Sequence, residues 1–336
     1  MTRAVRPSTP ADAEAIVALL SEAGLRPKIA PRELHWRYWL PRADWPGPRS
    51  YVVTDGSRLI AHGGLVPGTW LCGPRRVRAI HVIDWAAQRG AIGAGAMLMK
   101  YIAQQADLLI AIGGTDETLR MLPNLGFRPA GTVRGYGRTL HPWRLLHGAA
   151  GQQRLRRLVR ASGEAVRQLG AGHIRIKGWS VRQLAADSLG EIATALPSAR
   201  AGIGIAERRL EQFAYALECP IAPMTLSRVE SPQGVRGYFL LASVPGQVRI
   251  GDCWMDSERL EDWSAMLGCA LEQAAGDPQA AEIIAWGNDE LTAAALRKCG
   301  FRGGRELPMQ LRASVGVVTP AEPLRAQMLD SDAVYL

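Results

Sequence analysis

Long apolar runs and paired cysteines are both missing from this 336-residue chain. No apolar run approaches the roughly 18 residues that a membrane-spanning helix needs, so we do not expect a transmembrane protein. The five cysteines are scattered and contain no C-x-x-C pair, which favours neither a disulfide framework nor a zinc site. Asp12 and Glu14 precede the first apolar stretch, which argues against a secretory signal. We expect a cytoplasmic protein that holds reduced cysteines in its core and binds no metal.

Lysine is also scarce, because all but four of the 40 basic residues are arginines. The formal net charge of +9 favours anionic partners such as a nucleotide-bearing cofactor, nucleic acid or a membrane surface. No basic stripe interleaved with aromatic residues and no nucleic-acid-binding motif is present, so nucleic acid is the least favoured partner. The length of the chain and its 47% content of hydrophobic residues indicate about two globular domains.

A glycine-rich turn is the most informative stretch that is present. Residues 77–85 form an apolar, partly β-branched run that predicts a buried strand, and apolar residues at helical spacing follow the turn. Between them, Gly90, Gly93 and Gly95 would let the backbone approach a phosphate group, with the N–H groups of the next helix pointing at the anion. The alternative is a tight turn that uses glycine for its backbone angles and binds nothing.

The segments around this turn predict one α/β domain with a mixed sheet over residues 1–140. Alternating and β-branched patterns predict strands, and capping residues with 3.6-residue periodicity predict helices. The expected strands lie at 4–7, 50–54, 59–66, 77–85 and 108–112, and the expected helices begin at Thr9 and cover 31–40, the region after Gly95, and 115–125.

This order of elements, together with the glycine turn and the L-G-F-R sequence at 125–128, resembles the GNAT (Gcn5-related N-acetyltransferase) superfamily. The resemblance covers roughly residues 1–140 and implies that acetyl-CoA, or another acyl-CoA, is a co-substrate. The G-x-G-x-x-L pattern of the family stands at residues 93–98, and its preceding basic position falls on Gly90, with Arg89 one place earlier. The residues that the resemblance assigns to acyl-CoA binding are Ile83, Gln88, Arg89, Gly90, Ala91, Gly93, Ala94, Gly95 and Ala96.

The resemblance also implies acyl transfer to an amine, which requires a base and a donor for the developing oxyanion. In the family a backbone N–H of the strand before the glycine loop, here near Ile83 or Asp84, supports the oxyanion. Asp84 and His81 are the two candidates for the base, and strand alternation places them on opposite faces unless a bulge intervenes. The tyrosine that often protonates the thiolate is replaced by Leu122, so the acid would be Tyr136 or Cys72 from another strand, or water.

The second part of the chain repeats the first. Ile110-Ala111-x-Gly113, Thr118, Leu122 and the G-F-R at 126–128 recur 174 residues later as Ile284-Ala285-x-Gly287, Thr292, Leu296 and the G-F-R at 300–302. The constant offset predicts a second GNAT-like domain at 177–315. Its segment at 255–266 contains no glycine and four acidic residues, which would oppose a diphosphate, so we expect this copy to be degenerate.

Two connecting segments complete the predicted organisation. Residues 141–176 form a linker in which a basic amphipathic helix at 152–169 could contact an anionic membrane surface peripherally. Residues 316–336 contain prolines and are acidic near Asp330 and Asp332, which predicts a loosely held tail. The expected fold class is therefore α/β (α+β mixed sheet), with two tandem GNAT-like acyltransferase folds. The acceptor and the oligomeric state are not identified by the sequence.

Two other functions stay open beside a GNAT-type acyltransferase with one competent site. A non-catalytic scaffold, or a module that binds a membrane or a partner, would account for the missing tyrosine and the acidic replacement of the second loop. Transfer of a larger acyl or aminoacyl group is the third possibility, because tandem GNAT-like domains also occur in proteins that use aminoacyl-tRNA.

Overall fold

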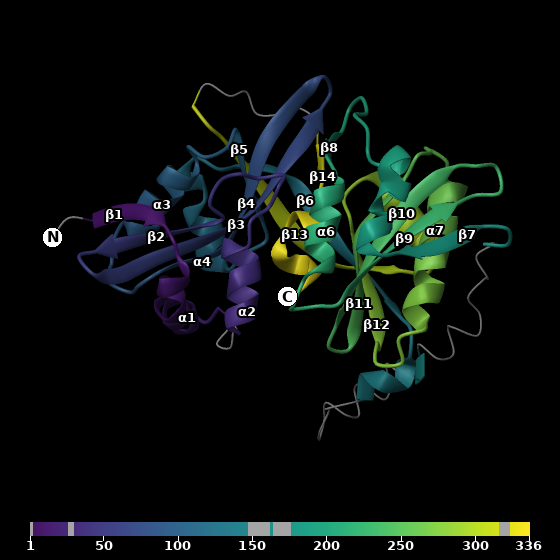
Figure 1. Ribbon diagram of the computed structural model, residues 1–336, viewed down its shortest axis with the longest axis horizontal. Coiled ribbons are helices and arrows are strands. Elements are labelled where there is room, and N and C mark those ends of the chain that lie inside the picture. Colours follow the sequence, from purple (N-terminus) through teal and green to yellow (C-terminus); the bar gives the residue numbers. More distant parts are fainter. Residues whose placement is uncertain (1–2, 26–29, 147–161, 164–175, 316–322) are drawn as a thin grey trace.

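The computed structural model describes residues 3–25, 30–146, 162–163, 176–315 and 323–336. These residues form two α/β halves that lie side by side and share one 14-stranded mixed sheet (Figure 1). The mixed sheet and the two halves confirm the fold class predicted from the sequence. Short 3-10 helices lie at Pro10–Asp12, Pro123–Leu125, Pro142–Leu146, Ala186–Ala195, Met328–Asp330 and Asp332–Val334.

The first half is an antiparallel meander followed by a parallel strand. Its strands are β1 (Arg3–Pro7), β2 (Ser50–Asp55), β3 (Arg58–Cys72), β4 (Arg75–Ala87) and β5 (Leu108–Ile112). Strands β1 to β4 pair antiparallel in sequence order, and β5 pairs parallel to β4. Its helices are α1 (Ala13–Glu22), α2 (Pro31–Leu34) with a π-helical continuation at His35–Trp39, α3 (Ala94–Ile102) and α4 (Asp116–Met121).

The helices of the first half cover both faces of this sheet. Successive side chains of a strand point to opposite faces, and on β2 Val52 packs with α1 and α2 while Tyr51 and Val53 pack with α3. The apolar residues predicted for the first helix, Ile16, Leu19 and Leu20, are all buried. The sheet is thus a central layer with α1 and α2 on one side and α3 on the other.

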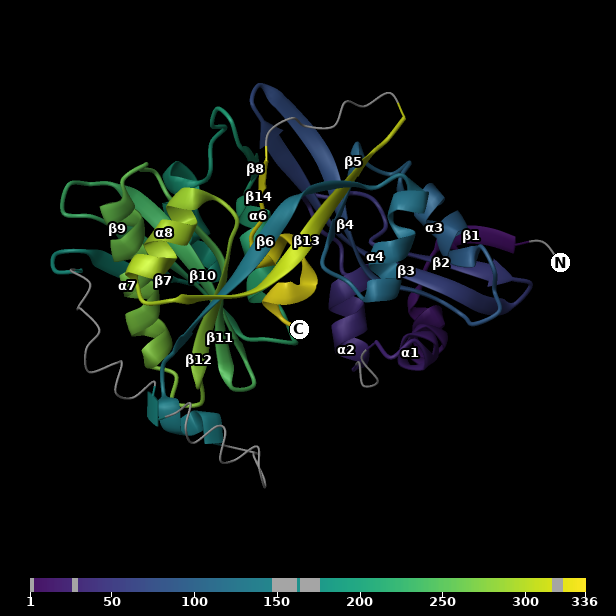
Figure 2. The ribbon, with the colours of Figure 1, turned by 180° about the vertical axis from the view of Figure 1, so that it is seen from behind.

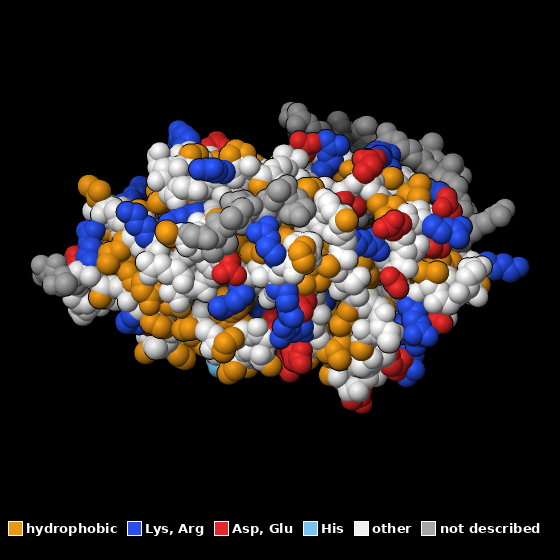
Figure 3. All heavy atoms as spheres, turned by 90° about the horizontal axis from the view of Figure 1, so that it is seen from above, with side chains coloured by type: hydrophobic (Ala, Val, Ile, Leu, Met, Phe, Trp, Pro, Cys, Tyr) orange, Lys and Arg blue, Asp and Glu red, His pale blue; other side chains and the backbone are white. Residues whose placement is uncertain are grey.

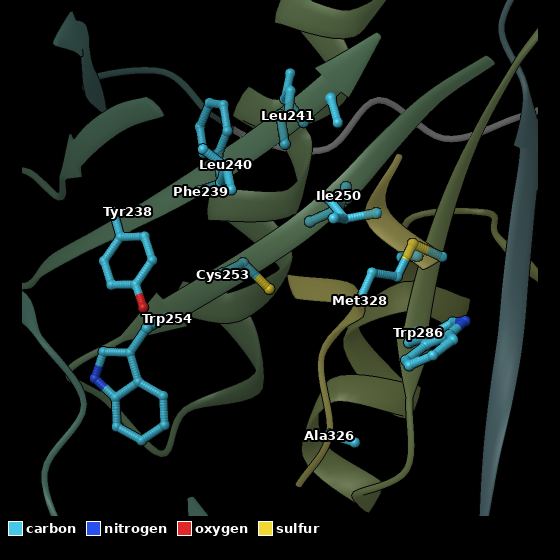
Figure 4. Close-up of a cluster of buried hydrophobic side chains, with 14 of the residues drawn as sticks. Tyr238, Phe239, Leu240, Leu241, Ile250, Cys253, Trp254, Trp286, Ala326 and Met328 are labelled. Carbon is cyan, nitrogen blue, oxygen red and sulfur yellow. The ribbon is translucent and has the colours of Figure 1, made fainter. Parts of the chain in front are cut away.

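The second half repeats this plan around a larger buried cluster. Its strands are β7 (Ser180–Leu184), β8 (Gly204–Ala206), β9 (Met224–Glu230), β10 (Arg236–Val244), β11 (Gln247–Met255) and β12 (Glu282–Gly287), and its helices are α6 (Leu210–Leu217), α7 (Leu260–Ala275) and α8 (Glu290–Lys298). Strands β9, β10 and β11 form the antiparallel meander, and β12 pairs parallel to β11. Part of the core, including Trp254 and Trp286, is shown in Figure 4.

The last strand of each half has changed places with its counterpart. Strand β6 (Arg128–Thr139) follows the first half in sequence but pairs with β12, and β13 (Arg302–Ala313) follows the second half but pairs with β5. The two exchanged strands also pair with each other, and they cross between the halves in Figure 2. The contiguous boundaries expected at 1–140 and 177–315 therefore need correction, because each half completes its sheet with a strand from the other.

The tail expected to be loose is instead packed from residue 323 onward. Strand β14 (Leu324–Arg325) pairs with β8, and the side chains of Ala326, Met328 and Val334 are buried in the main cluster. Two arginines hold its carboxylates, Arg208 at 2.7 Å from Asp330 and Arg37 at 3.7 Å from Asp332. The acidic residues that suggested exposure are thus paired inside the protein.

Most of the linker lies outside the described residues, and so does nearly all of the basic segment 152–169; membrane contact through it stays a prediction. None of the helices that the structure describes is long and apolar enough to cross a membrane. On the face drawn in Figure 3, basic and acidic side chains are interspersed, and the described residues form no continuous basic patch there.

Candidate functional site

A bulge in β4 opens a gap between β4 and β5. The two strands pair only from Ala79 to His81, opposite Leu108 to Ile110. Beyond this point the register between β3 and β4 shifts, because Gly64 lies opposite Ile83 whereas His62 lies opposite Ala86. Asp84 lies within the extra stretch and has φ 47°, the one positive φ among the described non-glycine residues. An extra residue bends a strand and ends its pairing, so the ends of β4 and β5 are separated here.

A groove lies on the side of the gap where the glycine-rich turn ends; we call it the loop groove. It is lined by the end of β4, the start of α3, part of α1, and α4 with its N-cap Thr115, and it encloses about 1280 Å³ of space, part of it open to solvent. Gly90 and Gly93 have φ values of 86° and 80°, and an added Cβ at either would meet no atom within 4 Å. Gly93 is the N-cap of α3, so the N–H groups of the first helical turn have no acceptor within the helix.

A second cavity, the central cavity, lies between the two halves. It contains about 750 Å³ of space, part of it open to solvent, and is lined by β3, β4, β5, the π-helical segment at His35–Trp39, α6 and residues 329–335. The wall is mostly apolar and aromatic, and the Trp36 and Tyr215 rings stack 4.5 Å apart across the junction of the halves. Ile83 of β4 lines this cavity, whereas Trp85, two residues later, lines the loop groove. The bulge at Asp84 therefore lies between the two spaces.

His81 contributes an uncharged imidazole to the central cavity. Its Nδ1 lies 3.3 Å from the carbonyl oxygen of Asp330, which can only accept, so Nδ1 carries the hydrogen in this bond. Burial lowers the pKa of His81 to about 4, although the hydrogen bond to Asp330 opposes this shift. The ring is therefore neutral near pH 7, and the lone pair of Nε2 is available to accept a proton.

The Asp84 carboxylate is held by a buried arginine and a tyrosine. Arg37 forms an ion pair with Asp84 Oδ2, and the Tyr38 hydroxyl donates to the same oxygen at 2.6 Å. The backbone carbonyl of Asp84 accepts from His62 Nδ1 at 3.1 Å, and His62 Nε2 lies 2.8 Å from the hydroxyl of Ser50. These contacts hold the left-handed backbone of the bulge, whose conformation is unfavourable for residues with a side chain.

Solved structures with a similar fold are found at low sequence identity. Saccharomyces cerevisiae N-myristoyltransferase with bound myristoyl-CoA superposes with a TM-score of 0.61 at 13% identity, over 94% of this chain and 86% of that one. A tandem GNAT protein from the clavulanic acid biosynthesis pathway gives 0.56 at 10% identity, over 93% and 99% of the two chains. The chain has the tandem GNAT fold. A probable N-acyltransferase from Enterococcus faecalis V583 is also similar, with a TM-score of 0.58 at 13% identity, over 93% and 72%. No protein-family model matches the chain, and no curated protein matches it significantly.

Within the GNAT fold, most of the residues predicted to bind acyl-CoA lie together. Six line the loop groove, namely Gln88, Arg89, Ala91, Gly93, Gly95 and Ala96. Gly90 is exposed on the turn without lining the groove, and Ala94 is buried beneath the helix start. Ile83 lies instead on the wall of the central cavity.

The three predicted catalytic residues have different surroundings. His81 lines the central cavity, and Asp84 is next to it but engaged by Arg37 and Tyr38. Tyr136 lies on β6, is 3% exposed, and does not line the loop groove or the central cavity. Its ring packs against Gly287 of β12, where an added Cβ would lie only 3.2 Å from the ring. The expectation of Tyr136 as an acid is therefore corrected, because the strand exchange carries β6 to the second half.

Two parts of the site were not found from the sequence. Arg37 is 2% exposed, and its partner Asp84 is distant in the sequence, so no local pattern links the two residues. Residues 329–335 line the central cavity although their composition suggested a loose tail. The sequence does contain an aromatic stretch, Trp36, Tyr38 and Trp39, and Trp36 lines the cavity.

Proposed function

We propose that this protein is an acyltransferase that moves an acyl group from acyl-CoA to an amine, with one competent site in the first half. One observation carries the proposal: the glycine-opened start of α3 and the gap between β4 and β5 border the same groove, and a mostly apolar cavity lies beyond the bulge. The bound myristoyl-CoA of the similar yeast structure supports an acyl-CoA as the co-substrate.

The residues of the loop groove fit the diphosphate of a CoA molecule. Gly93 leaves the backbone uncovered, since an added Cβ there would meet nothing within 4 Å, and the same holds for Gly90 on the adjacent turn. At the start of α3 the N–H of Ala94 donates to the carbonyl of Ala91, which leaves the N–H groups of Gly95 and Ala96 and the positive end of the helix dipole for a phosphate. Arg89 is exposed on the rim and adds a guanidinium, which pairs well with phosphate oxygens. In this site acyl-CoA supplies the activated acyl group.

The chain's own groups account for the remaining requirements of acyl transfer. Beyond His81, β4 no longer pairs with β5, so the backbone N–H groups of β4 near the bulge do not donate to β5. They can donate instead to a developing oxyanion. His81 is neutral near pH 7 and lines the cavity, so its ring can accept a hydrogen bond from an attacking amine and take up the proton as the C–N bond forms; burial, which lowers its pKa to about 4, makes it a weak base for this step. We favour His81 over Asp84 as the base because the Asp84 carboxylate already accepts from Arg37 and Tyr38.

The acyl group is the finer part of the proposal. Acetyl-CoA is the donor implied by the resemblance to N-acetyltransferases, whereas a solved structure with the same fold binds myristoyl-CoA. The central cavity does not select between them, because part of its space of about 750 Å³ is open to solvent and four arginines, Arg37, Arg42, Arg49 and Arg208, interrupt its apolar wall. The first experiment therefore uses both.

Thermal unfolding in the presence of acetyl-CoA and of myristoyl-CoA tests the proposal. A ligand at 100 times its dissociation constant stabilises a protein by about 2.7 kcal/mol, so a donor that binds should raise the melting temperature of the wild type by several degrees. Gly93→Asp should abolish this increase because its carboxylate faces the diphosphate. Gly93→Ala is the matched control, because it also puts a side chain on a backbone with a φ of 80° but adds no charge. Unchanged melting of the wild type with millimolar amounts of either donor contradicts the proposal.

A further inference from the structure

The second half contains a gap equivalent to the one between β4 and β5. Strands β11 and β12 pair in parallel only from Gln247 to Ile250, opposite Glu282 to Ala285. Immediately beyond, Leu240 lies opposite Asp252 while Leu241 lies opposite Ile250, so Gly251 is an extra residue in β11. Helices α7 and α8 follow β11 and β12 as α3 and α4 follow β4 and β5. The same strand separation is thus present at the same place in both halves.

The gap of the second half is filled by residues 324–328. Gln327 Nε2 donates to the carbonyl of Cys253 on β11 at 2.8 Å. On the other side, the Asn288 side chain, directly after β12, donates to the carbonyl of Leu324 and accepts from the N–H of Ala326 at 3.2 Å. The segment is therefore hydrogen-bonded to both edges of the gap. In the view of Figure 4, Met328 lies between the side chains of Ile250 and Trp286, within one buried cluster.

The Arg325 side chain occupies the position that corresponds to the loop groove. Its Nε lies 3.2 Å from Asp289 Oδ2, and its guanidinium lies 4.3 Å from the centre of the Trp263 ring. Asp289 is the N-cap of α8, just as Thr115, which lines the loop groove, is the N-cap of α4. Trp263 is in the first turn of α7, where α3 has the small residues of the glycine turn. Arg325 is only 5% exposed, so it is held as an inserted group.

The start of α7 is unsuited to a phosphate. Its N-cap region carries the buried carboxylate of Asp262, which accepts from the Ser257 hydroxyl at 2.6 Å. The Trp263 indole donates to the Ser257 carbonyl at 2.7 Å and fills the space that a glycine would leave open. A carboxylate and a bulky ring at this point favour a cationic side chain such as Arg325 over an anion.

We propose that the second half is a peptide-binding unit that holds residues 324–328 of its own chain in the place where the first half binds acyl-CoA. The comparison with acyl-CoA rests on the proposed function of the first half, whereas the binding of the segment does not. Two consequences follow. The chain takes up one acyl-CoA, and the anchored segment positions residues 329–335 as a wall of the central cavity.

Hydrogen exchange of the full-length chain tests the anchoring. In Arg325→Ala and in Asn288→Ala, the amides of 324–335 should exchange at least tenfold faster than in the wild type, while the amides of β9 and β10 stay protected. Arg297→Ala is the matched control, because this arginine is on α8 but its side chain is 50% exposed. In Arg325→Lys the exchange rates of these amides should lie between those of the wild type and of Arg325→Ala, since lysine keeps the charge but loses the planar group that stacks on the ring. Exchange at 324–335 that matches the control in both anchor variants would overturn the proposal.

Calorimetric titration with acetyl-CoA, and with myristoyl-CoA if acetyl-CoA does not bind, tests the stoichiometry separately. We expect one equivalent per wild-type chain and none for Gly93→Asp, with one equivalent retained in Arg325→Ala. Two equivalents in the wild type, or one equivalent that persists in Gly93→Asp, would show that the second half binds the donor and would overturn the proposal. A wild type that binds neither donor contradicts the proposed function instead, and the exchange experiment then decides whether the second half binds the segment.

Discussion

Asp84 and Asp252 occupy corresponding places in the two halves. Each lies at the bulge of the strand that precedes the gap, and each carboxylate accepts from a buried arginine and a tyrosine hydroxyl. For Asp84 the donors are Arg37 and Tyr38, and for Asp252 they are Arg208 at 2.8 Å and Tyr238 at 2.9 Å. The second half thus keeps the polar support of the bulge although its gap holds a peptide segment. This conservation of chemistry within one chain indicates that the pair has a structural role.

Asp84→Asn should lower the free energy of unfolding by about 3–5 kcal/mol, because it leaves the guanidinium of Arg37 buried without its closest counter-charge. Asparagine tolerates the left-handed backbone as well as aspartate does, so the loss reports the charge and not the φ of 47°. Urea unfolding measures it. Glu306→Gln, which breaks the exposed pair with Arg134, is the control and should cost less than about 1 kcal/mol. If both variants lost the same free energy of unfolding, the pair of Asp84 and Arg37 would have no special structural role.

His81→Gln should reduce acyl transfer by about 10²–10⁴-fold, the usual contribution of a general base, with little change in donor binding. The release of free CoA thiol in the presence of a panel of amines measures the rate. All five cysteines are buried, so they should add little background to a thiol reagent. His35→Gln, a change at an exposed position of the π-helical segment His35–Trp39, should leave the rate unchanged. If the rate of His81→Gln were within twofold of the wild-type rate, His81 would not be the general base.

Stability should fall as the pH is lowered from about 6.5 toward 4. Burial lowers the pKa values of His62 and His81 to about 4, below the ordinary value of 6.5. In this range the unfolded chain binds protons that the folded chain does not, so acid favours unfolding. Each histidine should cost roughly 2 kcal/mol between pH 7 and pH 5. Urea unfolding at several pH values measures the free energy of unfolding, which should depend less on pH in His62→Gln than in the wild type. The same pH dependence in both proteins would contradict the lowered pKa of His62.

A fragment of residues 1–140 should not unfold cooperatively on its own. Without β13 its strand β5 has an unpaired edge, and its own β6 has lost the strand β12 with which it pairs. Co-expression with residues 141–336 should restore a stable complex, because both exchanged strands then find their partners. Thermal melts followed by circular dichroism distinguish the two situations. A cooperative transition of the isolated fragment at the melting temperature of the full chain would show that the exchange is dispensable.

Much of the local structure could be predicted because it depends on nearby residues. Strand β5 was expected at 108–112, where the structure has it, from a short apolar run between turn signals. The turn at Gly93 was expected from its glycines, and Gly126 and Gly300, which end the repeated motif, both have left-handed backbones with φ values of 84° and 75°. The repeat itself predicted the tandem fold, since a constant offset needs no knowledge of the partners in space.

The features that could not be predicted depend on residues far apart in the chain. The pattern of β6 or β13 indicates a strand but not its neighbour, so the exchange was invisible in the sequence. Alternation placed His81 and Asp84 on opposite faces, and a positive φ at a non-glycine residue gives no local signal. The carboxylates of Asp330 and Asp332 suggested an exposed tail, because their partners Arg208 and Arg37 lie in different halves.

The strand exchange also sets the order in which the molecule can be assembled during synthesis. Domains usually fold as they leave the ribosome, the N-terminal one first. Here β5 must wait for β13, which emerges only after the strands and helices of the second half. Such distant pairings slow folding, because the chain loses entropy before the contacts form. The nascent first half therefore carries an open sheet edge, and a chaperone that covers this edge would act mainly before translation ends.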